Sequence, residues 1–194
     1  RQMCIRDSNY GDSDEMSVGH RIMFFDIEVE VTDGFPDVQK AQNVITSIAL
    51  YDCLTDKYFT YCFDPEKRIR SYTKDDEVVE FYDTEYEMLN KFFQKYLEIR
   101  PTIISGWNSE FFDIPYLYNR AVRILGPEVA NLLSPISQVL YSEYKKKHTI
   151  AGVSSLDYLQ LYRQFTFGQK SSYRLDYIGA VSYTHLTLPT SGVV

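Results

Sequence analysis

The segment FFDIEVE, residues 24–30, alternates apolar and acidic residues, and this alternation constrains the fold more than any other feature of the chain. Successive side chains of a β-strand point to opposite faces of a sheet. Asp26, Glu28 and Glu30 therefore share one face, while the apolar residues between them occupy the other. The pattern predicts a strand over residues 21–31 whose apolar face anchors it in a core.

The spacing of the three acids predicts which of them act together. With a rise of about 3.3 Å per residue, Asp26 and Glu28 lie within roughly 7 Å of each other, whereas Glu30 is about 13 Å from Asp26. Two carboxylates so close repel, and one is pushed towards protonation unless a cation lies between them. Divalent cations match the hardness of carboxylate oxygen, so Asp26 and Glu28 are candidate metal ligands and Glu30 is expected to be a solvated charge.

Alternating acids also occur on strands that have one face in water, and this simpler role is compatible with the spacing. The run that leads into the acids, Ile22 to Phe25, is apolar on both faces. This run favours a strand inside the sheet over an edge strand, although spacing alone leaves both roles open.

A third acid, Asp113, lies in the string GWNSEFFDIPYLYNR, between a predicted buried strand over residues 102–107 and a predicted helix. Ligands of open α/β sheets bind at the carboxyl ends of central strands, which makes Asp113 a candidate site residue. It also fits a simpler role, in which its charge complements the positive end of the helix. Asn108, directly after the strand, either orients a group of the site or acts as a turn former.

The periodicity of the remaining chain predicts a mixture of strands and helices. β-Branched and aromatic residues predict strands over 43–52 and 57–64, joined as an antiparallel hairpin by the short connection CLTD. Apolar residues at helical spacing predict a helix over 84–100, with Thr84 and Glu87 as a capping box. Three further elements are expected: a helix after residue 108 with Pro115 in its first turn, a basic exposed hairpin or loop over 143–152, and an amphipathic helix over 154–165.

Composition bounds the class of protein. The hydrophobic content of 44% supports a sizeable core, and the chain lacks both a signal-peptide pattern and a run of roughly 18 apolar residues, so a soluble chain is expected. Three cysteines without metal-type spacing indicate a reducing compartment. The net charge of -7 argues against broad wrapping of nucleic acid, but it permits a small site where metal ions supply the positive charge.

Three segments of the chain resemble segments of a known protein family. FFDIEV and SGWNSEFFDIPYLYNR resemble the first and second exonuclease motifs of family B DNA polymerases, and VSSLDYLQLYRQFTFGQKSSYRLDYI resembles the segment that follows in phage-type members. The resemblance implies an RNase H-like α/β fold, with a mixed β-sheet flanked by helices. It also implies 3'-5' proofreading, the removal of mispaired nucleotides from single-stranded 3' DNA ends with two divalent cations, Mg2+ or Mn2+. By position, it assigns Asp26, Glu28 and Asp113 as catalytic, metal-binding carboxylates.

The resemblance further assigns DNA contacts to Phe35, Asn108 and Phe112. Phe35 lies in the turn DGFPD, where its ring would stack on a base of the DNA strand. Stacking suits a protein that binds DNA without regard to base sequence. The alternative is that Phe35 is an apolar plug that anchors the turn. The implied partners are a single-stranded 3' end, the rest of the polymerase chain and, for the parent protein, a sliding clamp, without a membrane. The implied location is the cytoplasm of a phage-infected host cell.

The chain departs from the family at the third exonuclease motif, a tyrosine followed four positions later by the last catalytic aspartate. Tyr173 and Asp176 are one residue too close together, and the position that would fit is Tyr177. Asp157 lies within a helical pattern and is expected to be solvated or to cap locally. We therefore expect the fourth carboxylate to be absent from this chain, which would hold at most one cation weakly.

Both ends differ from the segment between them. Residues 181–194 contain no Asp, Glu, Lys or Arg, and residues 1–8 do not begin with Met. Both strings resemble translated sequencing-adapter DNA, so we expect a partial exonuclease domain over 9–180, incomplete at its C-terminus, between non-native ends; ordinary irregular tails are the alternative. Two other functions stay open: a freestanding RNase H-like nuclease, and a binding or scaffolding module that has lost metal chemistry.

Overall fold

The computed structural model describes residues 19–32, 34–166, 168 and 170–183. The predicted non-native ends, 1–8 and most of 181–194, lie outside the described residues, so that expectation stays a prediction. The main sheet has seven strands in the order β4-β5-β3-β2-β1-β6-β9. Its strands are β1 (Ile22–Val29), β2 (Ile45–Asp52), β3 (Lys57–Phe63), β4 (Tyr72–Lys74), β5 (Glu77–Tyr82), β6 (Ile103–Gly106) and β9 (Ser154–Asp157).

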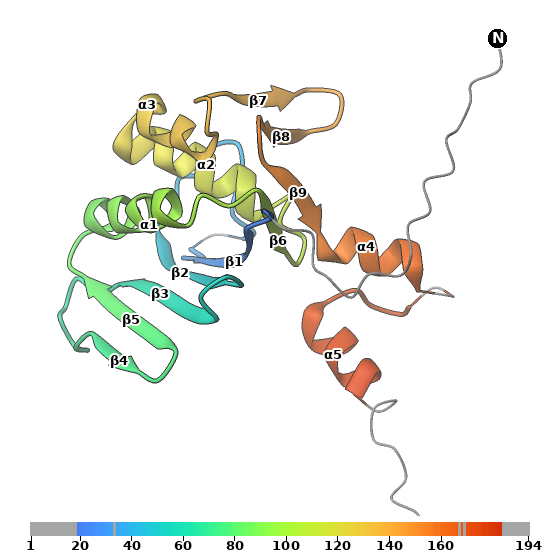
Figure 1. Ribbon diagram of the computed structural model, residues 1–194, viewed down its shortest axis with the longest axis horizontal. Coiled ribbons are helices and arrows are strands. Elements are labelled where there is room, and N and C mark those ends of the chain that lie inside the picture. The colour runs from blue at the N-terminus through green and yellow to red at the C-terminus, as the bar shows by residue number, and fades with distance from the viewer. Residues whose placement is uncertain (1–18, 33, 167, 169, 184–194) are drawn as a thin grey trace, which may run out of the picture.

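Helices pack on one face of this sheet and continue beyond its edge (Figure 1). In Figure 1 α1 and α2 lie above the strands, whereas α4 and α5 follow β9 at the far end of the sheet. The helices are α1 (Glu85–Ile99), α2 (Asp113–Leu125), α3 (Pro127–Ala130), the 3-10 turn η1 (Asn131–Leu133), α4 (Tyr158–Phe165) and α5 (Leu175–Tyr183). The expected mixed α/β sheet flanked by helices is confirmed.

Strand β1 lies inside the sheet, with an antiparallel neighbour on one side and a parallel neighbour on the other. Its alternate residues Met23, Phe25 and Ile27 are buried in the core beneath the helices. The other face of β1 is open, because Phe24 on that face is 41% exposed. The expectation from the apolar run Ile22–Phe25, a strand inside the sheet and not at its edge, is thus confirmed.

The predicted hairpin and first helix are confirmed. Strands β2 and β3 pair antiparallel, with Ser47 opposite Cys62 and Asp52 opposite Lys57. Helix α1 begins after Thr84, whose side chain accepts a hydrogen bond from the backbone N–H of Glu87. Apolar residues on one side of α1 are fully buried, so packing reinforces the cap.

One predicted helix is partly wrong. Residues 154–165 do not form a single helix, because Ser154–Asp157 pairs in parallel with β6 as the edge strand β9 and only Tyr158–Phe165 is helical. Pairing with a neighbouring strand satisfies backbone groups that a helical pattern read from one segment cannot anticipate. The strands β4 and β5 were also not predicted. Strand β5 pairs in parallel with β3, and β4 pairs antiparallel with β5.

The predicted basic hairpin is present as a separate two-stranded sheet, but it begins before the predicted range of 143–152 and is exposed only in part, since His148 and Ile150 are buried. It consists of β7 (Val139–Ser142) and β8 (Lys147–Ile150), which pair antiparallel.

Helix α2 begins at Asp113 and holds Pro115 in its first turn, as expected, where a missing N–H breaks no helical hydrogen bond.

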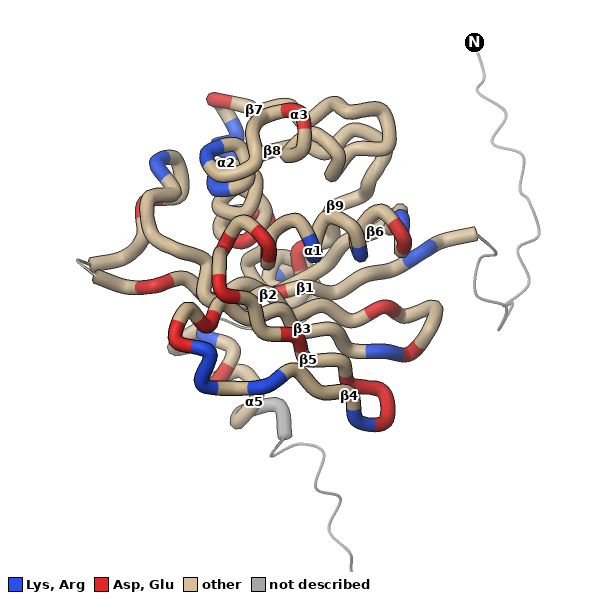
Figure 2. Tube along the Cα trace, turned by 90° about the vertical axis from the view of Figure 1, so that its left-hand side faces the viewer, with Lys and Arg blue, Asp and Glu red and all other residues tan. Residues whose placement is uncertain are grey.

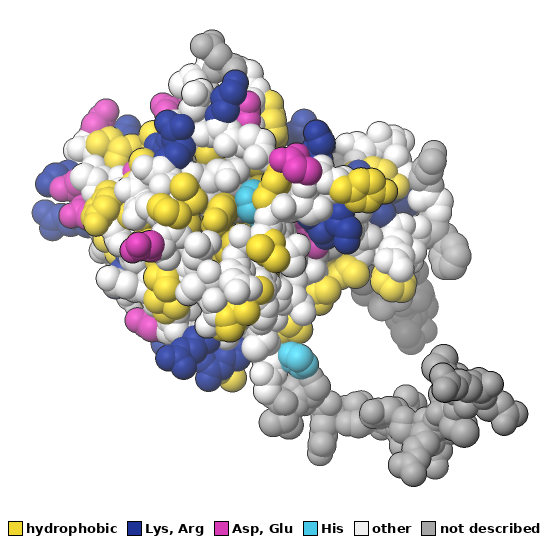
Figure 3. Space-filling view, turned by 90° about the horizontal axis from the view of Figure 1, so that it is seen from above, with side chains coloured by type: hydrophobic (Ala, Val, Ile, Leu, Met, Phe, Trp, Pro, Cys, Tyr) yellow, Lys and Arg dark blue, Asp and Glu magenta, His cyan; other side chains and the backbone are white. Residues whose placement is uncertain are grey.

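Charges of both signs are mixed over the surface. Figure 2 shows acidic and basic residues along the strand ends and turns of the sheet, close to one another. On the face seen from above, Lys and Arg side chains are interspersed with acidic and apolar ones (Figure 3). This mixture is unlike the single-signed surface that wraps nucleic acid. Within the described residues, no helix is both long and apolar enough to cross a membrane.

Candidate active site

The open face of β1 carries the first two candidate acids. Asp26 and Glu28 occupy alternate positions of the strand, opposite Ala49 and Ser47 of β2, and both point to the exposed side. The register of the two strands shifts directly after Glu28. Glu30 lies beyond the end of β1 and is exposed, in agreement with its predicted role as a solvated charge.

Asp113 joins this strand from a distant part of the chain. It begins α2, is 3% exposed, and its Oδ1 accepts a hydrogen bond of 3.1 Å from the backbone N–H of Ile27. Because Ile27 stands between Asp26 and Glu28, this bond brings the second motif alongside the first. Asp113 therefore does more than complement the helix end, which was the simpler role open from the sequence.

The electrostatics of the acids show strain between like charges. Burial, with a smaller contribution from the nearby charge of Asp26, raises the pKa of Asp113 to about 7. Burial also raises the pKa of Asp26, with a smaller contribution from the charge of Glu28. Among the described residues, none of these three carboxylates forms an ion pair with Lys, Arg or His. Repulsion without a cationic partner is the condition that a bound cation would relieve.

The donor set fits a hard divalent cation in chemistry, because all three side chains offer carboxylate oxygens. The arrangement is not a closed site: within the part of the chain that the structure describes, no three His, Cys, Asp or Glu side chains are grouped to hold a metal ion. The three acids instead form two pairs of interacting charges that share Asp26. One pair is Asp26 with Glu28 on β1, and the other is Asp26 with Asp113 on α2.

The side chain of Asp157 binds the backbone of the loop between β6 and α2. This carboxylate is 3% exposed and accepts backbone N–H groups of Asn108 and Glu110, each at 3.1 Å, as well as those of Leu159 and Gln160 at the start of α4. The prediction of a local cap is confirmed, whereas the alternative of a solvated acid is wrong. Sequence reasoning missed the contact with the loop, and an acid at a strand-to-helix junction was its only local signal.

Asn108 has the backbone conformation of a turn residue. Its φ of 65° is left-handed, which asparagine tolerates better than most residues, and its carbonyl accepts the N–H groups of Phe111 and Phe112. The role as turn former is therefore confirmed, and a role in orienting a substrate stays a prediction.

The two predicted aromatic DNA contacts lie together. The ring of Phe35 is 80% exposed and lies 5.2 Å from the ring of Phe112, measured between centroids. Phe112 is half-buried and in turn lies 5.6 Å from Tyr116. The exposed ring of Phe35 therefore packs on one side against Phe112, and its contact with DNA stays a prediction.

Comparison with known proteins decides the family. The profile of the family described as DNA polymerase family B, exonuclease domain, matches residues 3–178. The chain belongs to this family. It is 34% identical over 187 residues to the DNA-directed DNA polymerase of Escherichia phage RB69, which covers 81% of this chain and 20% of that protein. It is 33% identical over 197 residues to the DNA-directed DNA polymerase of Enterobacteria phage T4, covering 86% of this chain and 22% of that protein.

A third relative matches a smaller part of this chain. DNA polymerase 1 of Saccharolobus solfataricus is 38% identical over 101 residues, which is 51% of this chain and 11% of that protein. The chain thus spans about a fifth of the length of the two phage relatives. The resemblance read from the two motifs is confirmed, together with the RNase H-like α/β class that belongs to the family.

In this exonuclease domain, Tyr173 lies just before α5, and Asp176 and Tyr177 lie in its first turn. Asp176 forms an exposed ion pair with Arg174, with 3.3 Å between Nη2 and Oδ2. The carbonyl of Tyr173 accepts a hydrogen bond of 3.1 Å from Nε1 of Trp107. Leu175 lines a shallow depression beside Asp26 on the open face of the sheet. The absence of the fourth carboxylate stays a prediction.

Proposed function

We propose that this chain is part of the proofreading exonuclease of a family B DNA polymerase. In the intact domain it would hydrolyse the last phosphodiester of a single-stranded 3' DNA end and release a nucleoside monophosphate. The observation that supports this most directly is the hydrogen bond from Ile27 to Asp113, since it unites the two motifs at one place.

Asp26, Glu28 and Asp113 are the residues that would hold divalent cations, Mg2+ or Mn2+. Bound cations of this kind activate water and stabilise a leaving oxygen in phosphodiester hydrolysis. The protein's own contribution is a set of oxygen donors whose mutual repulsion disfavours the metal-free ionised state. The intact domain would take two cations, whereas this chain would hold at most one weakly, because a fourth carboxylate is expected to be missing.

The DNA end would enter over the turn that carries Phe35. Its exposed ring would stack on a base, with Phe112 behind it, and stacking is indifferent to base identity. Asn108 would orient the strand from the loop next to Asp113. The parent polymerase would supply the rest of the DNA path and the contact with a sliding clamp, in the cytoplasm of a phage-infected cell.

Calorimetric titration of Mn2+ into the wild-type chain and the Asp26→Ala variant tests the metal site. We expect a measurable heat for the wild type and a much smaller heat for Asp26→Ala. Glu30→Ala is a matched control, because Glu30 is an exposed acid beyond the end of β1 and is expected to be a solvated charge. Equal heats for wild type and Asp26→Ala would instead indicate a binding or scaffolding module without metal chemistry.

Degradation of a single-stranded oligonucleotide with Mg2+ tests the extent of activity. We expect slow hydrolysis by this chain, because loss of one ligand misplaces both the attacking water and an ion. A rate equal to that of an intact polymerase would contradict the expected missing carboxylate and would favour a freestanding nuclease.

A further inference from the structure

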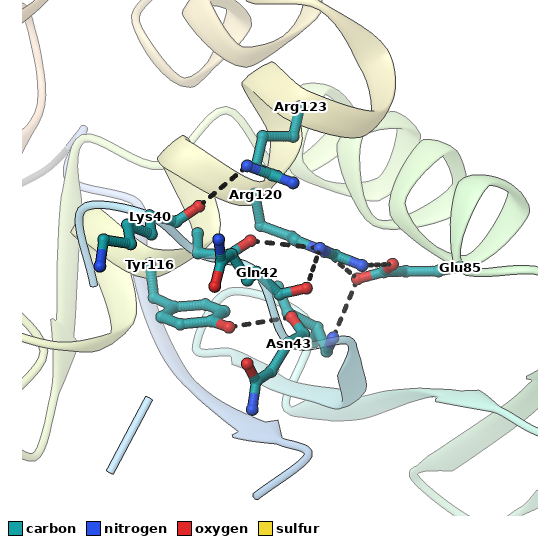
Figure 4. Close-up of polar contacts among 9 residues, drawn as sticks. Lys40, Gln42, Asn43, Glu85, Tyr116, Arg120 and Arg123 are labelled. Atoms are coloured by element: carbon teal, nitrogen blue, oxygen red, sulfur yellow. Dashed lines mark hydrogen bonds and ion pairs between the residues drawn. The ribbon is translucent and has the colours of Figure 1, made fainter. Parts of the chain in front are cut away.

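Four side chains of α2 bind the backbone that follows the Phe35 turn. They are spaced so that they share one side of the helix, and together they bind carbonyl groups of residues 38–43. Figure 4 shows three of the four, Tyr116, Arg120 and Arg123, with the carbonyls that they bind. We call this set the α2 clasp; it consists of Tyr116, Asn119, Arg120 and Arg123.

The α2 clasp binds almost every carbonyl of the segment. Arg120 Nη1 donates to the carbonyls of Ala41 and Gln42 at 3.1 and 2.7 Å. Tyr116 Oη donates to the carbonyl of Asn43 at 2.9 Å. Asn119 and Arg123 reach the carbonyls of Val38 and Lys40 at 2.9 and 3.3 Å.

The conformation of the bound segment is not one that its own residues favour. Ala41 is fully buried with a φ of 42°, a left-handed geometry that is unfavourable for a residue with a Cβ atom. Arg120 is in turn fixed by the buried carboxylate of Glu85, with 2.8 Å between Nε and Oε1. The same Oε1 accepts the backbone N–H of Ile45 at 2.9 Å. The segment is therefore shaped by tertiary contacts with α1 and α2.

The other end of the turn is tied to the same helix. The rings of Phe35, Phe112 and Tyr116 form a row with centroid distances of 5.2 and 5.6 Å, which runs from an exposed side chain to one that is fully buried. Tyr116 thus contacts the turn in two ways. Its ring packs against Phe112, which packs against Phe35, and its hydroxyl binds the carbonyl of Asn43 after the turn. Helix α2 begins at Asp113, the candidate metal ligand. Phe35 therefore packs, through Phe112, against the same helix that carries this ligand.

We propose that the α2 clasp is a positioning element of the exonuclease site, and that Tyr116 is its central positioning residue. It holds Phe35 at a set position relative to Asp113, so that a 3'-terminal base stacked on Phe35 brings its phosphate to the carboxylates. This inference rests on the proposed function, and it adds a role for side chains that lie outside the two motifs.

The test compares two variants of the same helix. Tyr116→Phe removes the bond to Asn43 and keeps the ring, whereas Tyr118→Phe removes a bond of 3.0 Å to Asn131 and leaves the clasp intact. The probe is a short single-stranded oligonucleotide with 2-aminopurine at its 3' end, whose fluorescence falls on stacking, titrated in Ca2+. Since one neutral hydrogen bond contributes a factor of about 2–10, we expect Tyr116→Phe to weaken binding by about that factor and Tyr118→Phe to resemble the wild type.

Two further measurements separate positioning from general stability. Mn2+ binding followed by calorimetry should be the same in both tyrosine variants, because neither change touches a carboxylate of the site. Adding Tyr116→Phe to Phe35→Ala should weaken oligonucleotide binding no further, since the residue would act through Phe35. Asn119→Ala, which releases only the carbonyl of Val38, is a second variant if Tyr116→Phe does not fold.

The outcomes distinguish this inference from the function on which it rests. If Phe35→Ala weakens binding while Tyr116→Phe and Asn119→Ala behave like Tyr118→Phe, the clasp has no positioning role and the proposed function stands. If the wild type does not bind the oligonucleotide, or if Phe35→Ala binds as well as the wild type, the DNA contact itself is wrong and the inference falls with it.

Discussion

The backbone N–H of Ile27 donates a hydrogen bond of 3.1 Å to Oδ1 of Asp113, although the two residues are 86 positions apart in the chain. This bond locks the start of α2 to the strand that carries Asp26 and Glu28. It occupies one oxygen of Asp113 with a structural contact.

Replacement of Asp113 separates this structural contact from its charge. Asp113→Ala leaves the buried N–H of Ile27 without an acceptor, and we expect the free energy of unfolding to fall by about 1–3 kcal/mol. Asp113→Asn keeps a carbonyl oxygen in place and removes the repulsion with Asp26, so its stability without metal at pH 8 should equal or exceed that of the wild type. Both variants should lose most of the heat of Mn2+ binding. Urea denaturation in EDTA measures the stabilities, and equal losses in the two variants would contradict the proposed role of the hydrogen bond.

The raised pKa of Asp113 predicts how stability depends on pH. Its folded pKa of about 7 lies above the value of 3.8 expected for the unfolded chain, so the folded state holds this proton more tightly. Stability should therefore fall as pH rises from about 4 to about 7, with a slope of up to about 1.4 kcal/mol per pH unit from this group. The raised pKa of Asp26 acts in the same direction.

Denaturation series at several pH values in EDTA check this prediction, with Asp113→Asn as the comparison. The variant should show a flatter dependence between pH 4 and pH 7. A wild type whose stability rises steadily over this interval, in parallel with the variant, would show that Asp113 is ionised at ordinary pKa.

Gly106, the last residue of β6, is expected to be intolerant of a side chain. A Cβ atom there would lie 2.6 Å from the carbonyl oxygen of Phe25 and 2.9 Å from Cβ of Ser109. The first contact is with backbone directly before Asp26, so relief would require β1 to shift. Gly106→Ala should lower the free energy of unfolding by about 1–3 kcal/mol and weaken Mn2+ binding. Gly179→Ala is the control, because a Cβ atom there meets nothing within 4 Å and alanine suits a helix.

Asp157 is expected to matter for the order of the loop next to Asp113. Asp157→Ala removes the cap of α4 and leaves the N–H groups of Asn108 and Glu110 unpaired, for which we expect a loss of about 2–4 kcal/mol. Hydrogen exchange should quicken for the amides of residues 108–110 and 159–160. Exchange in α1 and β2 should change only by the amount that global unfolding requires; a uniform increase across the chain would rule out a local role.

Much of the local structure is predictable because its signals are local. The alternation in residues 24–30 correctly placed Asp26 and Glu28 on one strand face, and the spacing of apolar residues with Thr84 correctly predicted α1. Reading residues 154–165 as one helix failed, since the first four residues pair with β6. Helical periodicity in a short segment cannot compete with a strand partner that lies far away in the sequence.

The sequence by itself determined the local elements, the pair of acids on β1 and, through its motifs, the family, because each of these is encoded in residues close together along the chain. Only the tertiary structure decided that Asp113 binds between the two acids, that Asp157 supports the loop, and that the α2 clasp holds the Phe35 turn. These contacts join residues tens of positions apart. Their formation depends on which strands and helices become neighbours, which is settled by the packing of the whole core.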